Sequence, residues 1–180
     1  CPQRVVDLCD DFLREVPQHL PTLLTKCRAL IRLGHSEAAV AITRDILHRD
    51  SDCMPAVVMR AEALLGTGNI TAATQTLTAA LRLDPANQDA RTLLKKVRAL
   101  EAEKAAGNKA YAEGRSAEAI EHYSRALAME SHSPTFDAVL YSNRGQAHLR
   151  ERRYREALSD LNKAIALDPR YAKAYAKRAA

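Results

Sequence analysis

Small and apolar positions recur along this chain with a period of 34 residues. Gly34 and Gly68 lie 34 residues apart, and each is followed by two alanines at the fourth and fifth positions after it. The same frame fits again around Gly114 and from Tyr141 onward. Between these points the apolar residues keep the three- and four-residue spacing of one helix face. The pattern predicts a succession of helix–turn–helix units, in which the three glycines end the first helix of their pairs.

Small residues and prolines mark where the expected helices cross and end. Gly145 and Ala157 stand where the two helices of one pair approach each other closely. Pro85 and Pro169 follow second helices and stop them, because proline cannot continue a helix. One pair cannot bury its apolar stripe alone, so the pairs must stack into a solenoid with a concave face. The frame resembles the tetratricopeptide repeat, and the expected fold is an all-α tetratricopeptide-repeat superhelical solenoid.

The repeat frame divides the chain into a first array over 1–100 and a second array over 101–180. Between the second and third turn glycines the period stretches from 34 to 46 residues. Nothing in that stretch breaks a helix, so we expect one long helix over 88–112, about 37 Å long at 1.5 Å per residue. It would close the first array and open the second as a stiff junction. A break near 101–103 with free domain motion is the alternative.

Both ends of the chain and one loop depart from the frame. Residues 1–17 match the second helix of a repeat whose first helix is missing, and 172–180 match a first helix without its partner. We therefore expect the chain to be a piece of a longer protein, because a cut in mid-repeat leaves apolar faces open. A four-residue insertion around 131–136 predicts a longer loop there.

The composition agrees with packed helices in a soluble protein. Apolar residues make up 47% and charged residues 27% of the chain, and Trp is absent. No apolar run is long enough to span a membrane and no signal peptide is present, so we expect neither membrane association nor secretion. Cys9 and Cys27 fall on apolar repeat positions, which favours reduced core thiols. The expected location is the cytoplasm, with the nucleus as a further compartment.

The net charge of +5 is spread in a way that argues against a nucleic-acid partner. The 27 basic residues are interleaved with 22 acidic ones, and the densest basic stretch, 150–155, still contains Glu151. There is no basic tail and no pair of stacking aromatics, so a solvated helix face explains these charges. What is left is a mild preference for acidic partners.

The sequence contains no signature of catalysis. It has no GxSxG or HExxH motif and no Gly-rich phosphate loop, and its six histidines are scattered. We expect the protein not to be an enzyme and to need no cofactor or metal.

Polar residues at concave positions of the second array carry the candidate chemistry. Lys104 and Asn108 are four residues apart and share one helix face. Asn143 and Lys173 lie near the starts of the next two repeats. Cations and amide donors without acidic neighbours suit a carboxylate, because charge-assisted hydrogen bonds are short and strong. The same repeat positions add Lys177 to this set, and Tyr111, Gln146 and Arg150 as accessory groove residues.

The equivalent positions of the first array are mostly apolar and hold no such set. They are occupied by Leu24, Arg28, Ile31, Val58, Glu62 and Leu65. This groove suggests contact with an unfolded client protein or with an intramolecular partner.

Three segments of the second array resemble the carboxylate-clamp motif of the Hsp70/Hsp90 co-chaperones. They run from Lys104 through Gly107-Asn108 to Tyr111, over Tyr141-Ser142-Asn143-Arg144, and from Lys173 to Ala179. In that family the motif grips the C-terminal Glu-Glu-Val-Asp of the chaperones. With its long junction, the chain is most similar to the co-chaperones that combine tetratricopeptide repeats with a C-terminal J domain, although no J domain lies within these residues.

The resemblance implies a role for each member of the set. Lys104, Asn108 and Asn143 would hold the terminal carboxylate of the bound tail. Lys173 and Lys177 would hold the second carboxylate of the final Asp.

Two further positions qualify this assignment. Tyr111 would offer the tail an apolar wall. Lys177 stands where the family usually has Arg, and Lys keeps the charge but loses the planar fork that makes bidentate contacts.

Two other functions remain open on the sequence alone. The runner-up is a general protein-interaction scaffold whose groove takes an unrelated peptide or helix. Direct nucleic-acid binding through the basic residues is a third and weaker alternative.

Overall fold

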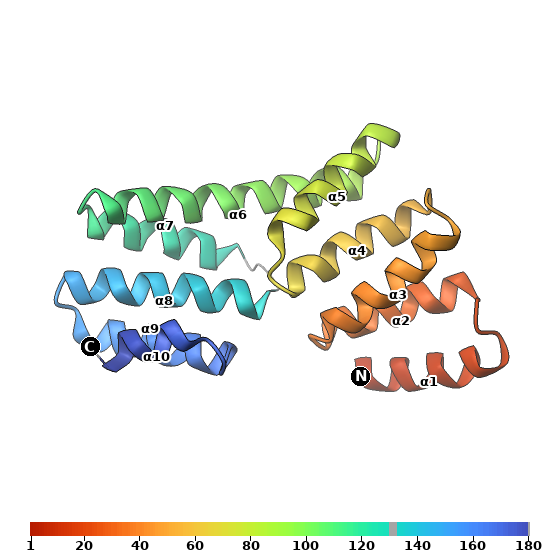
Figure 1. Cartoon of the computed structure of the whole chain (residues 1–180), viewed down its shortest axis with the longest axis horizontal. Coiled ribbons are helices and arrows are strands. Elements are labelled where there is room, and N and C mark those ends of the chain that lie inside the picture. The colour runs from red at the N-terminus through yellow and green to blue at the C-terminus, as the bar shows by residue number, and fades with distance from the viewer. Residues whose placement is uncertain (130–132, 180) are drawn as a thin grey trace. The chain divides into compact units, whose positions relative to one another are not determined.

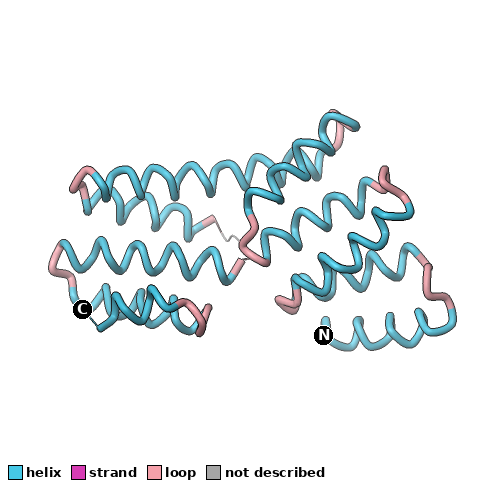
Figure 2. The backbone as a smooth tube through the Cα atoms, in the orientation of Figure 1, coloured by secondary structure: helices cyan, strands magenta, loops and turns pink. Residues whose placement is uncertain are grey.

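The computed structural model describes residues 1–129 and 133–179, and these residues form helices joined by short loops (Figure 1, Figure 2). The helices are α1 (Pro2–Glu15), α2 (Leu20–Arg32), α3 (Ser36–Arg49), α4 (Met54–Gly66), α5 (Ile70–Leu83), α6 (Gln88–Ala112), α7 (Ser116–Ala128), α8 (Pro134–Arg150), α9 (Tyr154–Leu167) and α10 (Ala172–Ala179). The all-α repeat fold is therefore confirmed. The long helix over 88–112 is also confirmed, because α6 runs through 101–103 without a break.

The prolines and glycines act where the repeat frame places them. The helices α5 and α9 each end two residues before a proline, Pro85 and Pro169. At Gly145, a Cβ atom would lie 3.0 Å from Leu161 Cγ and 3.3 Å from the carbonyl oxygen of Ala157. A Cβ here would press on Leu161 and on the backbone of α9, so glycine suits the close approach of α8 and α9.

The loop expected around 131–136 is only partly within the described residues. Residues 131 and 132 lie outside them. The prediction is wrong for 134–136, because α8 already begins at Pro134. Ser133 caps this helix, since its Oγ accepts the backbone N–H of Phe136 over 3.3 Å. A proline is tolerated in the first turn because an N–H at that position would have no intrahelical acceptor.

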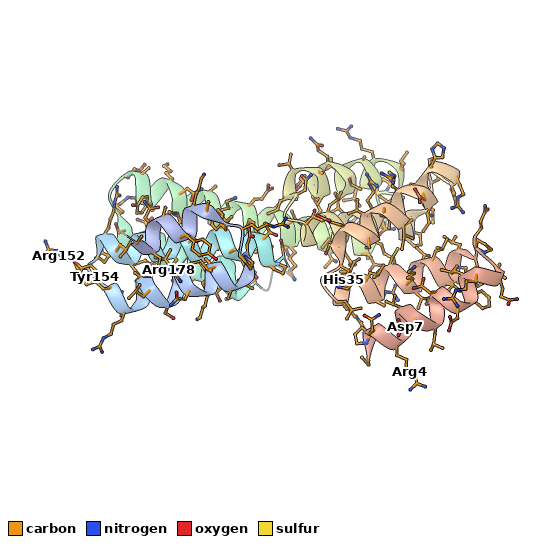
Figure 3. All side chains as sticks on the ribbon, turned by 60° about the horizontal axis from the view of Figure 1, so that its bottom comes forward. Arg4, Asp7, His35, Arg152, Tyr154 and Arg178 are labelled. Carbon is orange, nitrogen blue, oxygen red and sulfur yellow. The ribbon has the colours of Figure 1, made fainter. Side chains whose placement is uncertain are left out.

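The same backbone turn follows the first helix of four pairs. It is centred on Gly34, Gly68 and Gly114, with φ of 79°, 81° and 82°, and on Arg152, with φ of 58°. In each turn the next residue donates its N–H to a carbonyl five positions earlier, as from Arg153 to His148 over 2.9 Å. This is the Schellman motif, which uses a left-handed residue to satisfy the last carbonyls of a helix. Arg152 adopts it without being glycine, and its side chain extends away from the helices (Figure 3).

The chain forms two compact units, Cys1–Leu94 and Lys95–Ala180. In the first unit α2, α3, α4 and α5 pack in succession, with α1 against α2. In the second unit α8 packs against α7 and α9, and α10 packs against α9 and α8. Among the described helices, none combines the length and the apolar character that crossing a bilayer requires.

The thiols of the first unit are free and differ in exposure. Cys9, Cys27 and Cys53 are buried, whereas Cys1 is exposed. Burial raises the pKa of the Cys27 thiol to about 11 and also raises that of Cys9. The interpretation of Cys9 and Cys27 as reduced core residues is confirmed.

Candidate functional site

The predicted site residues of the second unit lie on three helices. Lys104 and Asn108 are one turn apart on α6, Asn143 is in the middle of α8, and Lys173 and Lys177 are one turn apart on α10. We call these five residues the donor cluster. Asn108 and Lys173 are exposed, and the other three are half-buried.

Hydrogen bonds connect the three helices through the donor cluster. Asn143 Nδ2 donates to Asn108 Oδ1 over 3.3 Å, which joins α8 to α6. Lys177 Nζ donates to Asn143 Oδ1 and to the carbonyl oxygen of Ser142, over 3.4 Å each, which joins α10 to α8. The structure thus brings together residues that are separated by 34 and 35 positions in the chain.

Lys177 carries its charge in an unfavourable place. Burial lowers the pKa of its ammonium group, and the nearby charge of Lys173 lowers it further. Within the described residues, no member of the donor cluster forms an ion pair with an acidic side chain. An anionic ligand would supply the missing countercharge to Lys173 and Lys177.

Lys104 lies one turn before Asn108 on α6. Its Nζ is 5.2 Å from the centre of the Phe136 ring, within the range of a cation–π contact. Phe136 is buried at the start of α8. The ring therefore restrains Lys104 without neutralising its charge.

The accessory residues separate into a contacting pair and one residue apart. The Arg150 guanidinium lies 3.9 Å from the centre of the Tyr111 ring, and its Nη1 donates to the Tyr111 carbonyl oxygen over 2.8 Å. The ring predicted as an apolar wall thus has a cation on its face. Gln146 is half-buried on α8, and no described contact joins it to the donor cluster.

A buried ion pair that the sequence did not predict lies beside the cluster. Arg144 donates through Nε and Nη2 to both carboxylate oxygens of Asp160, over 2.7 and 2.8 Å, and through Nη1 to Ser124 Oγ over 2.8 Å. The side chains of Arg144 and Asp160 are only 18% and 6% exposed. This pair ties α8 to α9 and α7 directly after Asn143. The sequence offers one hint of this pair: Arg144 and Asp160 are spaced along the chain like two residues that face each other on paired helices.

Tyr123 and the difference in charge between the two units are two further features of the site that were not predicted. The buried Tyr123 hydroxyl donates to Asn108 Oδ1 over 2.8 Å. Residues 95–180 contain 17 Lys and Arg against 11 Asp and Glu, whereas 1–94 contain 10 against 11. The whole positive excess therefore belongs to the unit that holds the donor cluster, a signal that counting by array would have found.

Comparisons with known proteins place the repeats in a family. Two tetratricopeptide-repeat models match residues 24–90 and 138–171. The chain is 33% identical over 177 residues to DnaJ homolog subfamily C member 7 of Homo sapiens, covering 98% of this chain and 36% of that protein. It is 35% identical over 154 residues to the Schizosaccharomyces pombe homolog, covering 86% of this chain and 32% of that protein. The chain thus spans about a third of the length of these relatives.

A solved structure supports the fold. The tetratricopeptide-repeat domain of P58(IPK) superposes with a TM-score of 0.74 at 20% identity. The match covers 96% of this chain and 48% of that one. At this identity the likeness concerns the architecture of the repeats.

Proposed function

Because this chain belongs to the tetratricopeptide-repeat family, whose helix pairs present concave binding faces, we propose that its second array binds the C-terminal tail of a partner protein. The donor cluster would grip the terminal carboxylate. The observation that carries this proposal is the convergence of Asn108, Asn143 and Lys177 from three helices, with two more lysines beside them. Their role is recognition rather than catalysis.

The proposed ligand is the acidic Glu-Glu-Val-Asp tail of an Hsp70 or Hsp90 chaperone. Three features support it. The cluster matches the clamp motif of the co-chaperones at four of five positions, with Lys177 in place of Arg, the second unit carries the positive excess of the chain, and the relatives are DnaJ homologs by name. A chaperone-associated adaptor is therefore the proposed role, and a general scaffold with another peptide or helix as ligand is the competing one.

The test compares two peptides ending in Glu-Glu-Val-Asp that differ only at the C-terminus. Calorimetric titration of the protein with the free acid should give clear binding. The C-terminal amide should bind much more weakly, because it removes the charge that the lysines would hold. Equal affinities for the two peptides would exclude the clamp. A steep loss of binding to a random oligonucleotide with salt would instead support a nucleic-acid site.

Substitutions in the cluster sharpen this test. Asn143→Ala should cost about 1–3 kcal/mol of binding, the usual cost of a lost buried partner. The matched control is Asn162→Ala, because Asn162 lies on α9 and contacts Arg178 outside the cluster. Lys177→Arg should strengthen binding of the free acid, since guanidinium restores a bidentate contact with carboxylate. A scaffold that binds a helix would respond to neither change.

A further inference from the structure

The side chain of Asn108 is held by a buried tyrosine from another helix. Tyr123, on α7, is 2% exposed, and its hydroxyl donates to Asn108 Oδ1 over 2.8 Å. Gly107 makes this contact sterically possible, because a Cβ atom there would lie 2.7 Å from Tyr123 Cε1. The glycine thus lets α7 bring a hydroxyl donor against the residue next to it.

The oxygen of each asparagine in the cluster already accepts from inside the protein. Asn108 Oδ1 accepts from the Tyr123 hydroxyl and from Asn143 Nδ2, while Asn143 Oδ1 accepts from Lys177 Nζ. An amide has one oxygen with two lone pairs and two N–H donors. Both lone pairs of Asn108 Oδ1 are therefore engaged, and its two N–H groups are what it offers to a ligand. Asn143 Oδ1 keeps its second lone pair, so the cluster, lysines included, presents mostly donors.

We infer that Tyr123 is a positioning residue that makes the donor cluster select an ionised carboxylate over a carboxamide. It acts through Asn108 and does not itself contact the ligand. A carboxylate brings only acceptors to a surface made mostly of donors, whereas a carboxamide also brings N–H groups, for which Asn108 Oδ1 has no lone pair left. Unpaired polar groups at a desolvated contact are costly, so the mismatch discriminates between the two. This inference rests on the proposed tail-binding function.

The tyrosine is suited to this task for two reasons. Burial raises the pKa of its hydroxyl to about 12, so it stays a donor throughout the neutral range. A phenylalanine would fill the same space against Gly107 and keep the packing, but it would leave Asn108 Oδ1 with only the longer bond of 3.3 Å from Asn143 among its described partners. Held by this one bond, the amide could turn more easily about its last bond and present its oxygen to the ligand.

The experiment measures the ratio of the affinities for the free-acid and amidated peptides in the wild type and in Tyr123→Phe. The ratio should fall about three- to tenfold in the variant, the factor that one hydrogen bond of about 1 kcal/mol supports. A purely structural role would weaken both peptides alike and leave the ratio unchanged, which would overturn the inference. Tyr141→Phe is the matched control, because Tyr141 contacts Arg144 and Lys163 through its ring face.

A second background shows whether the effect passes through Asn108. In an Asn108→Ala protein, the additional Tyr123→Phe change should leave the ratio unaltered. A fall of the same size there would contradict the positioning role.

The outcomes also separate this inference from the proposed function. Equal wild-type affinities for the acid and the amide would overturn both. A wild type that discriminates, with an unchanged ratio in Tyr123→Phe, would overturn the positioning role alone. The side-chain amide resonances of Asn108 provide a ligand-free check: they should shift in Tyr123→Phe, and unchanged resonances would count against the inference.

Discussion

Removing one partner of the buried ion pair between Arg144 and Asp160 should lower the free energy of unfolding strongly, whereas replacing both partners should lower it little. Asp160→Leu would leave the Arg144 guanidinium, 18% exposed, facing an apolar side chain instead of two carboxylate oxygens at 2.7 and 2.8 Å. Unit charges about 4 Å apart interact by about 4 kcal/mol at an effective dielectric constant of 20. Removal of one partner of a buried pair costs about 3–5 kcal/mol. We therefore expect Asp160→Leu to lower the free energy of unfolding by about 3–5 kcal/mol.

Urea unfolding followed by far-UV circular dichroism measures this free energy. The double variant Arg144→Met with Asp160→Leu should recover most of the loss, because no charge is then left buried. The remaining deficit should be about 1 kcal/mol, from the lost hydrogen bond of Ser124. Asp11→Leu serves as the control, because the Arg14–Asp11 pair is 78% and 66% exposed and should matter little.

Two results would refute this reasoning. A cost below about 1 kcal/mol for Asp160→Leu would mean that the pair behaves like an exposed one. A double variant as unstable as the sum of the single variants would mean that the two side chains do not act on each other.

Three shorter predictions follow from other contacts. Arg152→Gly should raise the free energy of unfolding by about 0.5–1 kcal/mol, because glycine takes the φ of 58° without strain; a lower urea midpoint would contradict this. The pKa of His148 lies below its usual 6.5 because of burial, so the unfolded chain binds a proton there before the folded chain does. The free energy of unfolding should therefore fall as the pH drops below 6.5, and this pH dependence should be weaker in His148→Gln. Gly107→Ala should lower the free energy of unfolding by about 1–3 kcal/mol in the same urea assay, because the new Cβ would collide with the Tyr123 ring. An unchanged urea midpoint would contradict this and would mean that α7 shifts to make room without loss of stability.

The periodic features of the fold were predictable because they depend on residues close in sequence. The turns at Gly34, Gly68 and Gly114 can be predicted from the residue type, since glycine adopts positive φ without steric cost. Arg152 makes the same turn and cannot be recognised from its own residue type. Only the repeat frame around it places a turn there. The first turn of α8 was predicted wrongly as loop, because Ser133-Pro134 suits a helix start as well as a loop.

The site was predictable in its members but not in its contacts. Lys104 and Asn108 can be recognised as a pair because their four-residue spacing places them on one helix face. The bonds from Asn108 to Tyr123 and to Asn143 depend on how three helices pack, which no local pattern specifies. The role of the cluster in binding a tail, like the client contact expected for the first array, stays a prediction.

Charge patterning hid the ion pair for a similar reason. Arg144 and Asp160 each look like one of the many interleaved charges of a solvated helix face. Their burial follows from the close approach of α8 and α9 at Gly145, which brings the two helices within reach of a bidentate contact. Long-range packing therefore decides which surface-like charges become part of the interior.

The unequal exposure of the thiols gives this protein a built-in handle for site-selective labelling. Among the described residues Cys1 is the exposed thiol, while Cys27 is inaccessible to solvent. The pKa of the Cys27 thiol is about 11, so this thiol stays protonated at neutral pH. Thiol-reactive dyes attack the exposed thiolate, so a maleimide fluorophore added briefly at neutral pH should modify Cys1 ahead of the buried thiols. The label would sit in the first unit, on a different compact unit from the donor cluster. A single-dye preparation made in this way lets tail peptides be titrated against native protein without a cysteine being engineered in or out.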